Sequence, residues 1–163
     1  MLGFLARFVL VFAALECLIV FGLWRDSWFA PQAALNARLS ALLCAPWIEG
    51  VQGVSSYLIA PTYAINIRPG CDAYQASAVL LAGIAAFPAP WTRKLWGALL
   101  GVLVLLVLNL VRLGAILWVG IHHRELFETM HLEVLPAVFL FVAVFLWLGW
   151  IAWVRPAPRP AAP

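Results

Sequence analysis

The chain has 163 residues, of which 66% are hydrophobic and 10% are charged, and its mean hydropathy is +1.01. These values lie far outside the range of soluble domains and indicate an integral membrane protein with little mass outside the bilayer. The net charge of +3 is small and dispersed, and the basic residues do not cluster with exposed aromatic residues, so no nucleic-acid partner is predicted.

Four stretches are long and apolar enough to cross a membrane, since a bilayer core of about 30 Å needs about 20 residues. They predict an all-α fold, a bundle of about four transmembrane helices forming one membrane-embedded domain over residues 1–154. The predicted spans are residues 2–24, 73–90, 97–121 and 133–154. The first is expected to be an uncleaved anchor, because Trp28 and Phe29 crowd the only candidate cleavage site, at Ala30.

The segment between the first two predicted spans is the only sizeable extramembrane part. Residues 33–43 have apolar side chains at helical spacing, which predicts an amphipathic helix lying on the outer membrane face. Residues 55–71 are rich in β-branched and aromatic types around Pro61, which predicts a short hairpin or extended segment that delivers Cys71 to the second span. The proline-rich tail, residues 155–163, is predicted to be disordered.

Basic residues in the short flanking segments predict which way the chain crosses the membrane. Positively charged short loops favour the cytoplasmic side. The residues concerned are Arg7, Arg93, Lys94, Arg155 and Arg159. Both termini are therefore expected in the cytoplasm, in a protein of the plasma (inner) membrane, with the long segment and Cys71 on the extracytoplasmic side.

Arg112 is the least expected residue of the third predicted span, because it interrupts a long apolar run. An arginine at the centre of a bilayer costs about 2.5–3.5 kcal/mol on insertion scales, so such a residue normally faces a protein interior or a wet cavity. Asn109 stands three residues earlier on the same helical face. The pair predicts a functional site within the bundle.

Cys71, Arg112 and His131 belong to three different spans but are expected at the same side of the membrane. The turn Pro69–Gly70 and a capping pair of Asp72 and Gln75 would place the sulfur at a helix N-terminus, where the pKa of a thiol falls, as it also does beside a cation. An imidazole can act as general base and acid, and a guanidinium can stabilise an oxyanion. These residue types together predict nucleophilic attack on a carbonyl.

Three segments carry a resemblance to a known family: RPGCDAYQA around Cys71, NLVRLGAI around Arg112 and HLEVLP around His131. In this order they resemble the exosortase/archaeosortase family, in particular its short, exosortase H-like members. The similarity covers roughly residues 65–153, and the Asn-x-x-Arg element is its most specific part. It implies a membrane-embedded cysteine protease and transpeptidase that cleaves a C-terminal sorting signal of secreted proteins at the outer membrane face.

The resemblance also implies roles for individual residues. Cys71 would attack the scissile carbonyl to give a thioester, Arg112 would stabilise the oxyanion and His131 would protonate the leaving amine. Asn109 would orient Arg112, and Asp72 would orient His131 or cap its own helix. The expected partners are membrane lipid and secreted substrates with a short motif, a transmembrane helix and a basic cluster. No cofactor and no metal is implied.

Other interpretations of the same residues remain open. Cys44 and Cys71 can form a disulfide, either structural or as the redox pair of a membrane thiol-disulfide oxidoreductase, although the chain has no Cys-x-x-Cys pair. Arg112 can pair with Glu16 or Glu133 to hold helices together. The protein can also be a non-catalytic membrane assembly subunit, which would need neither a free thiol nor an arginine facing a cavity.

A metal hydrolase is disfavoured. Its candidate ligands would be His122, His123 and His131, but they do not have the spacing of known zinc motifs.

Overall fold

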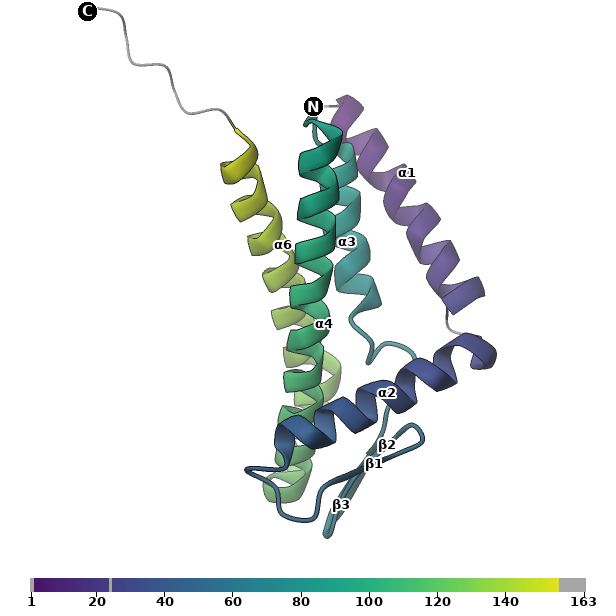
Figure 1. Cartoon of the computed structure of the whole chain (residues 1–163), viewed down its shortest axis with the longest axis vertical. Coiled ribbons are helices and arrows are strands. Elements are labelled where there is room, and N and C mark those ends of the chain that lie inside the picture. The colour runs from purple at the N-terminus through teal and green to yellow at the C-terminus, as the bar shows by residue number, and fades with distance from the viewer. Residues whose placement is uncertain (1, 24, 156–163) are drawn as a thin grey trace, which may run out of the picture.

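The computed structural model describes residues 2–23 and 25–155, which form a helical bundle with a small sheet at one end (Figure 1). The bundle contains α1 (Leu2–Leu18), α3 (Tyr74–Ala86), α4 (Trp91–His122) and α6 (Leu135–Val154), and α2 (Asp26–Cys44) runs across it. Short helical turns join the long helices: η1 (Ile19–Leu23), η2 (Arg124–Leu126), α5 (Phe127–Thr129) and η3 (Met130–Val134). Of the tail predicted to be disordered, only Arg155 lies within the described residues.

Three helical segments of the described chain are long and apolar enough to cross a membrane: Leu2–Leu23, Trp91–His122 and Arg124–Val154. They correspond to the first, third and fourth predicted spans, of which position 24 lies outside the described residues. The predicted class, a mostly helical membrane protein, is therefore confirmed. The count of four spans stays a prediction, because the fourth candidate is a shorter helix.

That shorter helix is α3, which begins and ends inside the predicted range of 73–90. Its 13 residues extend only about 20 Å at 1.5 Å per residue, less than the thickness of a bilayer core. Phe87 already has an extended backbone (φ −77°, ψ 138°), as expected close to Pro88 and Pro90. The apolar composition of residues 87–90 therefore predicted a continuing helix, whereas the prolines end it at Ala86.

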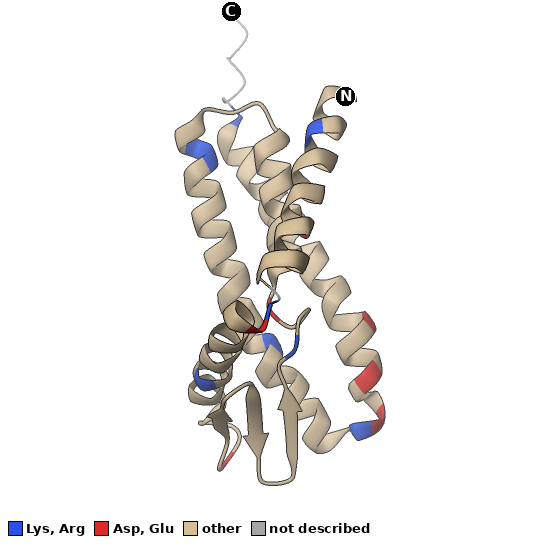
Figure 2. Cartoon of the chain, turned by 90° about the vertical axis from the view of Figure 1, so that its right-hand side faces the viewer, with Lys and Arg blue, Asp and Glu red and all other residues tan. Residues whose placement is uncertain are grey.

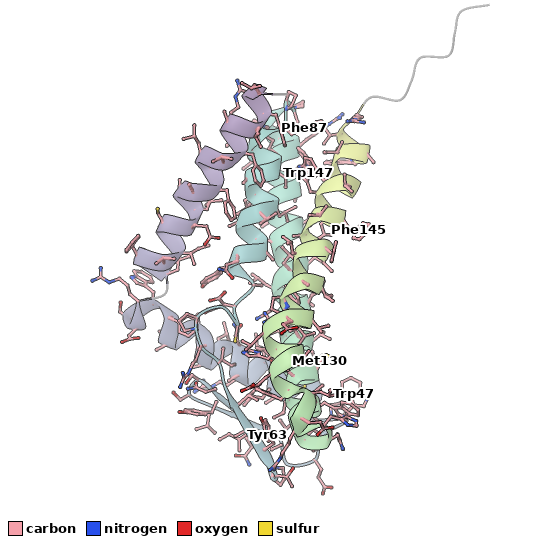
Figure 3. The ribbon with its side chains drawn as sticks, turned by 180° about the vertical axis from the view of Figure 1, so that it is seen from behind. Trp47, Tyr63, Phe87, Met130, Phe145 and Trp147 are labelled. Atoms are coloured by element: carbon pink, nitrogen blue, oxygen red, sulfur yellow. The ribbon has the colours of Figure 1, made fainter. Side chains whose placement is uncertain are left out.

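α3 lies at the centre of the bundle, in contact with α1, α4 and α6. Six of its eight buried residues are alanine, serine or glycine, and Gly83 faces the indole of Trp147 of α6, which is labelled in Figure 3. In lipid, the hydrophobic effect does not drive helices together, so they associate through close packing, which small side chains permit. At the far end, Trp150 donates a hydrogen bond to the carbonyl of Arg93 (3.0 Å), whose guanidinium donates to the carbonyl of Val154 (2.8 Å). These bonds join α4 to the end of α6.

The segment between α2 and α3 forms three strands, one more than the two of a hairpin. β1 (Gln52–Val54), β2 (Tyr57–Ala60) and β3 (Tyr63–Asn66) make an antiparallel meander in that order. The predicted helix of residues 33–43 is confirmed and extends further, as α2. Its buried residues recur at helical spacing and pack on the sheet and on α4: Phe29, Ala33, Asn36, Ala37, Ser40, Ala41 and Cys44.

The two ends of the bundle differ in chemistry. The start of α1, the turn between α3 and α4 and the end of α6 lie at one end, whereas α2 and the sheet lie at the other (Figure 1). Among the described residues, the acidic ones lie in the middle of the molecule and toward the sheet, whereas basic residues occur at both ends (Figure 2). The loop that follows β3 rises from the sheet into the bundle, and it carries the candidate nucleophile.

Candidate active site

The structure brings together the cysteine and the histidine that the sequence singled out. The Sγ of Cys71, on the loop between β3 and α3, lies 3.8 Å from the Nε2 of His131 in η3. These residues are 60 positions apart in the chain. The contact therefore depends on the tertiary fold, and a slight approach would place the thiol within hydrogen-bond reach of the ring.

The side chain of Asp72 organises the loop around the cysteine. Its Oδ2 accepts a hydrogen bond from the backbone N–H of Gly70 (3.3 Å), and its Oδ1 accepts one from that of Tyr74 (3.0 Å). Gly70 has a φ of +94°, a left-handed conformation that favours glycine, and Ala73 also has a positive φ of 64°. Asp72 is 1% exposed, so both of these hydrogen bonds lie in the interior of the protein.

The predicted capping pair of Asp72 and Gln75 is replaced by this arrangement. α3 begins at Tyr74, its N-cap position is Ala73, and no side chain of the N-cap residue bonds to the helix. The structure leaves Cys71 three residues before the helix and places Gln75 in the lining of a cavity. The expected effect of a helix N-terminus on the sulfur is therefore weaker than predicted, since it acts only within the first turn.

Asn109 holds the backbone of the nucleophile loop. Its Nδ2 donates a hydrogen bond of 2.9 Å to the carbonyl oxygen of Cys71, and the side chain is 1% exposed. The sequence predicted that Asn109 orients Arg112, but the structure shows its amide bonded to Cys71. The bond fixes the loop to α4 one helical turn before Arg112.

Arg112 is buried at the wall of a cavity, with 7% of its surface exposed. Its guanidinium carbon lies 5.3 Å from the centre of the Phe139 ring, within the range of a cation–π contact. The cavity has a volume of about 360 Å³ and opens between α1, α3, α4 and α6, with Glu16, Asp72 and Gln75 among its polar residues. This is the environment expected of an arginine inside a membrane protein.

No ion pair joins Arg112 to Glu16 or Glu133 within residues 2–23 and 25–155. Glu16 lines the same cavity, but its buried Oε1 has no hydrogen-bond partner among the described residues. The role of interhelical ion pair, considered above for Arg112, is therefore not realised. The charge interacts instead with Cys71 and Asp72.

The surroundings of Cys71 act on its thiol in opposite directions. Burial raises the pKa of Cys71, which is the largest effect, and the charge of Asp72 also raises it. The hydrogen bond with the backbone of Arg68 and the charge of Arg112 lower this pKa. The net direction is upward, contrary to the sequence-based expectation, because burial disfavours the thiolate more than Arg112 favours it. Burial therefore favours the neutral thiol of Cys71 over its thiolate.

His131 lies beside this thiol. Its ring stacks on Phe127 with the two ring centres 5.6 Å apart, and its Nε2 faces Cys71. Its Nδ1 is buried and has no hydrogen-bond partner in the described part of the chain. Asp72 bonds instead to backbone groups of its own loop, so capping fits its geometry better than orienting His131. His131 lies in a π-helical turn, a feature that is frequent at functional sites.

The loop of Cys71 separates two cavities. One is the cavity of Arg112, which is also lined by Gly70, Asp72 and Ala73. The other, of about 270 Å³, is lined by Cys71, His131, Arg68 and the strand β3. The sulfur-bearing residue Cys71 thus lines the cavity next to the sheet, whereas Arg112 lines the other cavity.

The other candidate residues lie apart from this site. Cys44 is buried in α2, with Gly114 of α4 directly beside its sulfur, and it lines a different cavity with Trp47 and Trp118. Cys44 and Cys71 are both free thiols in the structure, as is Cys17. The disulfide considered above is therefore not present.

The histidines at the end of α4 contact other residues. His122 and His123 pack on the ring of Trp118, and His123 lies 3.7 Å from the carboxylate of Glu125. Within the described ranges no three His, Cys, Asp or Glu side chains are grouped as a metal site would need.

Sequence reasoning missed the role of Phe139. Phe139 follows His131 by eight residues, and the π turn that contains His131, which only the structure shows, adds one residue to the ordinary helical repeat of seven. The two rings therefore share one face of the helical segment, where Phe139 contacts Arg112. A phenylalanine in an apolar helix gives no such indication by itself.

Comparison with known proteins yields no match: no family model, no curated protein and no solved structure is similar to this chain. The resemblance to exosortases therefore depends on the three short segments quoted above, and it remains a prediction. The functional argument depends on the geometry of the site.

Proposed function

We propose that the protein is a membrane-embedded cysteine peptidase and transpeptidase that cleaves a C-terminal sorting signal of secreted proteins through a thioester on Cys71. The observation that carries the proposal is the 3.8 Å separation of the thiol and the imidazole of His131, on separate elements and beside a buried arginine. A thiol, a base and a cation in one buried site match the requirements of acyl transfer.

In the proposed first step, Nε2 of His131 takes the proton of the Cys71 thiol as the sulfur bonds to the scissile carbonyl carbon. The carbonyl oxygen becomes an oxyanion, which Arg112 stabilises. When the intermediate collapses, the C–N bond breaks and the leaving amine receives the proton from His131. The products of this step are a thioester on Cys71 and a free amine.

In the proposed second step, an acceptor attacks the thioester. An amine, a hydroxyl group or water loses a proton to His131 and bonds to the carbonyl carbon, again with the oxyanion at Arg112. The C–S bond then breaks, and the sulfur recovers the proton. Asn109 acts throughout as a positioning residue, since it holds the backbone of Cys71.

The proposed site faces the extracytoplasmic side of the plasma (inner) membrane, with both termini in the cytoplasm. Support comes from Arg93 and Lys94, which lie at the end of the bundle opposite the sheet, in a tight turn of the kind that is retained in the cytoplasm. The proposed substrates, taken from the resemblance, are secreted proteins with a short motif, a transmembrane helix and a basic cluster.

A hydroxylamine test examines this function directly. The protein is purified from cells that express candidate substrates, and its intact mass is measured before and after neutral hydroxylamine, which cleaves thioesters. We expect an acyl adduct that hydroxylamine removes and that is absent from Cys71→Ala. The absence of any adduct under conditions of substrate cleavage would contradict the proposal, and a Cys44–Cys71 disulfide would favour the oxidoreductase alternative.

A further inference from the structure

The strand β3 has one edge that no other strand occupies. The sheet order is β1-β2-β3, so β1 and β3 are both edge strands. β1 lies against α2, where Gly53 comes so close to the backbone of Ala37 that no Cβ would fit. β3 lines the 270 Å³ cavity, and its outer edge pairs with no further strand of the described chain. At the start of β3, the ring of Phe127 packs on Tyr63, with the ring centres 5.5 Å apart. An uncovered strand edge is a template for another chain.

The register shows which backbone groups face that edge. Ile67 donates a hydrogen bond of 2.8 Å to the carbonyl of Ser56, which continues the ladder in which Ile65 pairs with Leu58. In an antiparallel ladder, every second residue directs its N–H and C=O to the neighbouring strand. Residues 63, 65 and 67 therefore bond to β2, and residues 64 and 66 direct theirs to the free edge.

These outward groups have no backbone partner within the described chain. Among the described residues, no backbone hydrogen bond outside the sheet ladder involves the N–H or the C=O of Ala64 or Asn66. The side chain of Ala64 is exposed, and that of Asn66 accepts a hydrogen bond from Ser56. Two residues of β3 thus offer donors and acceptors in the arrangement that a further strand requires.

The cavity next to this edge leads to the nucleophile. It is lined by β3, by Phe127 and His131, and by Leu113 and Ile116 of α4. In Figure 3, Tyr63 of the sheet and Met130 of η3 lie at the same end of the molecule, which agrees with this arrangement. Arg68 and Cys71 complete the lining, so the groove runs from the strand edge to the thiol.

We infer that the peptide segment preceding the scissile bond binds in this groove as an additional strand paired with β3. Backbone pairing to a strand edge is a recurring mode of peptide recognition. Ala64 and Asn66 would form the hydrogen bonds, and the scissile carbonyl would lie over Cys71. The inference rests on the proposed function and adds how its substrate is held.

This binding mode suits a reaction through a thioester. The acyl part must stay bound after the amine has left, until the acceptor attacks. Main-chain hydrogen bonds hold the acyl part of the peptide whatever its side chains are, so one enzyme can retain many substrates. The residues that identify a particular substrate are then left to the rest of the site.

Peptidyl chloromethyl ketones test the inference, because the thiol displaces chloride and forms a C–S bond at the end of the peptide. The background is Cys17→Ser with Cys44→Ser, which leaves Cys71 as the one thiol. Three reagents are compared by intact mass: iodoacetamide, acetyl-alanine chloromethyl ketone and its acetyl-tetra-alanine counterpart. We expect the longer ketone to react about tenfold faster than the shorter one, because it adds several backbone hydrogen bonds.

Two changes should abolish that gain. The first is N-methylation of alternate alanines of the probe, which leaves the protein unaltered. The second is Ala64→Pro, which removes an outward N–H, with Ala64→Val as the matched control that keeps it. Reaction with iodoacetamide should stay the same in both variants, which shows that the site is intact.

The outcomes separate the two proposals. Equal rates for the long and short ketones, or a gain that survives both N-methylation and Ala64→Pro, would overturn the strand pairing and leave the nucleophile standing. Failure of every reagent to modify Cys71 would contradict the proposed function, and the strand pairing with it.

Discussion

Replacement of Asn109 by leucine removes one hydrogen bond from the centre of the proposed site. The amide of Asn109 donates to the carbonyl of Cys71 at 2.9 Å, and the side chain is almost completely buried. Leucine has a similar size and shape, so the packing around α4 is preserved as far as possible. The carbonyl of Cys71 then loses its partner in a place that water reaches poorly.

The loss of this hydrogen bond is expected to lower the free energy of unfolding. A buried polar group left without a partner costs about 1–3 kcal/mol. Measured side-chain hydrogen bonds in membrane proteins average less, about 0.6 kcal/mol with a maximum of about 1.7 kcal/mol. The carbonyl of Cys71 lies in a tight turn that cannot easily seek another donor, so we expect the free energy of unfolding of Asn109→Leu to fall by about 1–2 kcal/mol.

The matched control is Asn36→Leu in α2. Asn36 is also buried, and each of the two amides has one buried atom without a hydrogen-bond partner among the described residues: Nδ2 of Asn36 and Oδ1 of Asn109. Only Asn109 donates a hydrogen bond, so the loss of Asn36 should cost little or increase stability. Unfolding in mixed detergent and SDS, followed by tryptophan fluorescence, gives both free energies. An unchanged stability of Asn109→Leu, or an equal loss in both variants, would refute the argument that this bond holds the loop.

Two further predictions concern the thiol and the packing of the sheet. The pH of half-maximal alkylation of Cys71 should lie above that of an unstructured cysteine peptide in the same detergent, because burial raises the pKa of this thiol. Since Arg112 lowers this pKa and Asp72 raises it, Arg112→Gln should move the midpoint to higher pH and Asp72→Asn to lower pH, and shifts of the same sign would contradict the electrostatic account. Gly53→Ala should lower the free energy of unfolding by about 2 kcal/mol or more, because the added Cβ would meet backbone atoms of α2. The control is Gly149→Ala, whose Cβ would meet no other atom, so this variant should be neutral or stabilising. Similar thermal unfolding of the two variants would contradict this packing.

The parts of the fold that depend on local composition were predictable. The long apolar runs gave three of the helices, and the spacing in residues 33–43 gave the helix α2. The end of the second predicted span was not predictable from hydropathy, which averages over the prolines at positions 88 and 90. Each proline nevertheless disfavours a helical backbone in the residue before it. The strand β1 also escaped prediction, because it lies before the predicted segment of residues 55–71, which contains only β2, β3 and the turn with Pro61 between them.

The candidate site could be predicted only as a set of residues. Cys71, Arg112 and His131 stood out because each is costly or reactive where it lies, and the structure gathers them around one loop. Their relations depend on distances that the sequence does not contain. The bond of Asn109 to a backbone carbonyl is one such relation, and the net upward shift of the pKa of Cys71 is another, because it depends on the depth of burial.

The central claim is that His131 acts as the base for Cys71, and the rate of alkylation of Cys71 tests it most directly. The measurement uses intact mass after treatment with iodoacetamide, in the background without the other two cysteines, and compares the parent protein with His131→Ala and with His122→Ala as the matched control. The account predicts that Cys71 alkylates at least tenfold more slowly in His131→Ala near neutral pH, and at an unchanged rate in His122→Ala. Equal rates in all three proteins would contradict it.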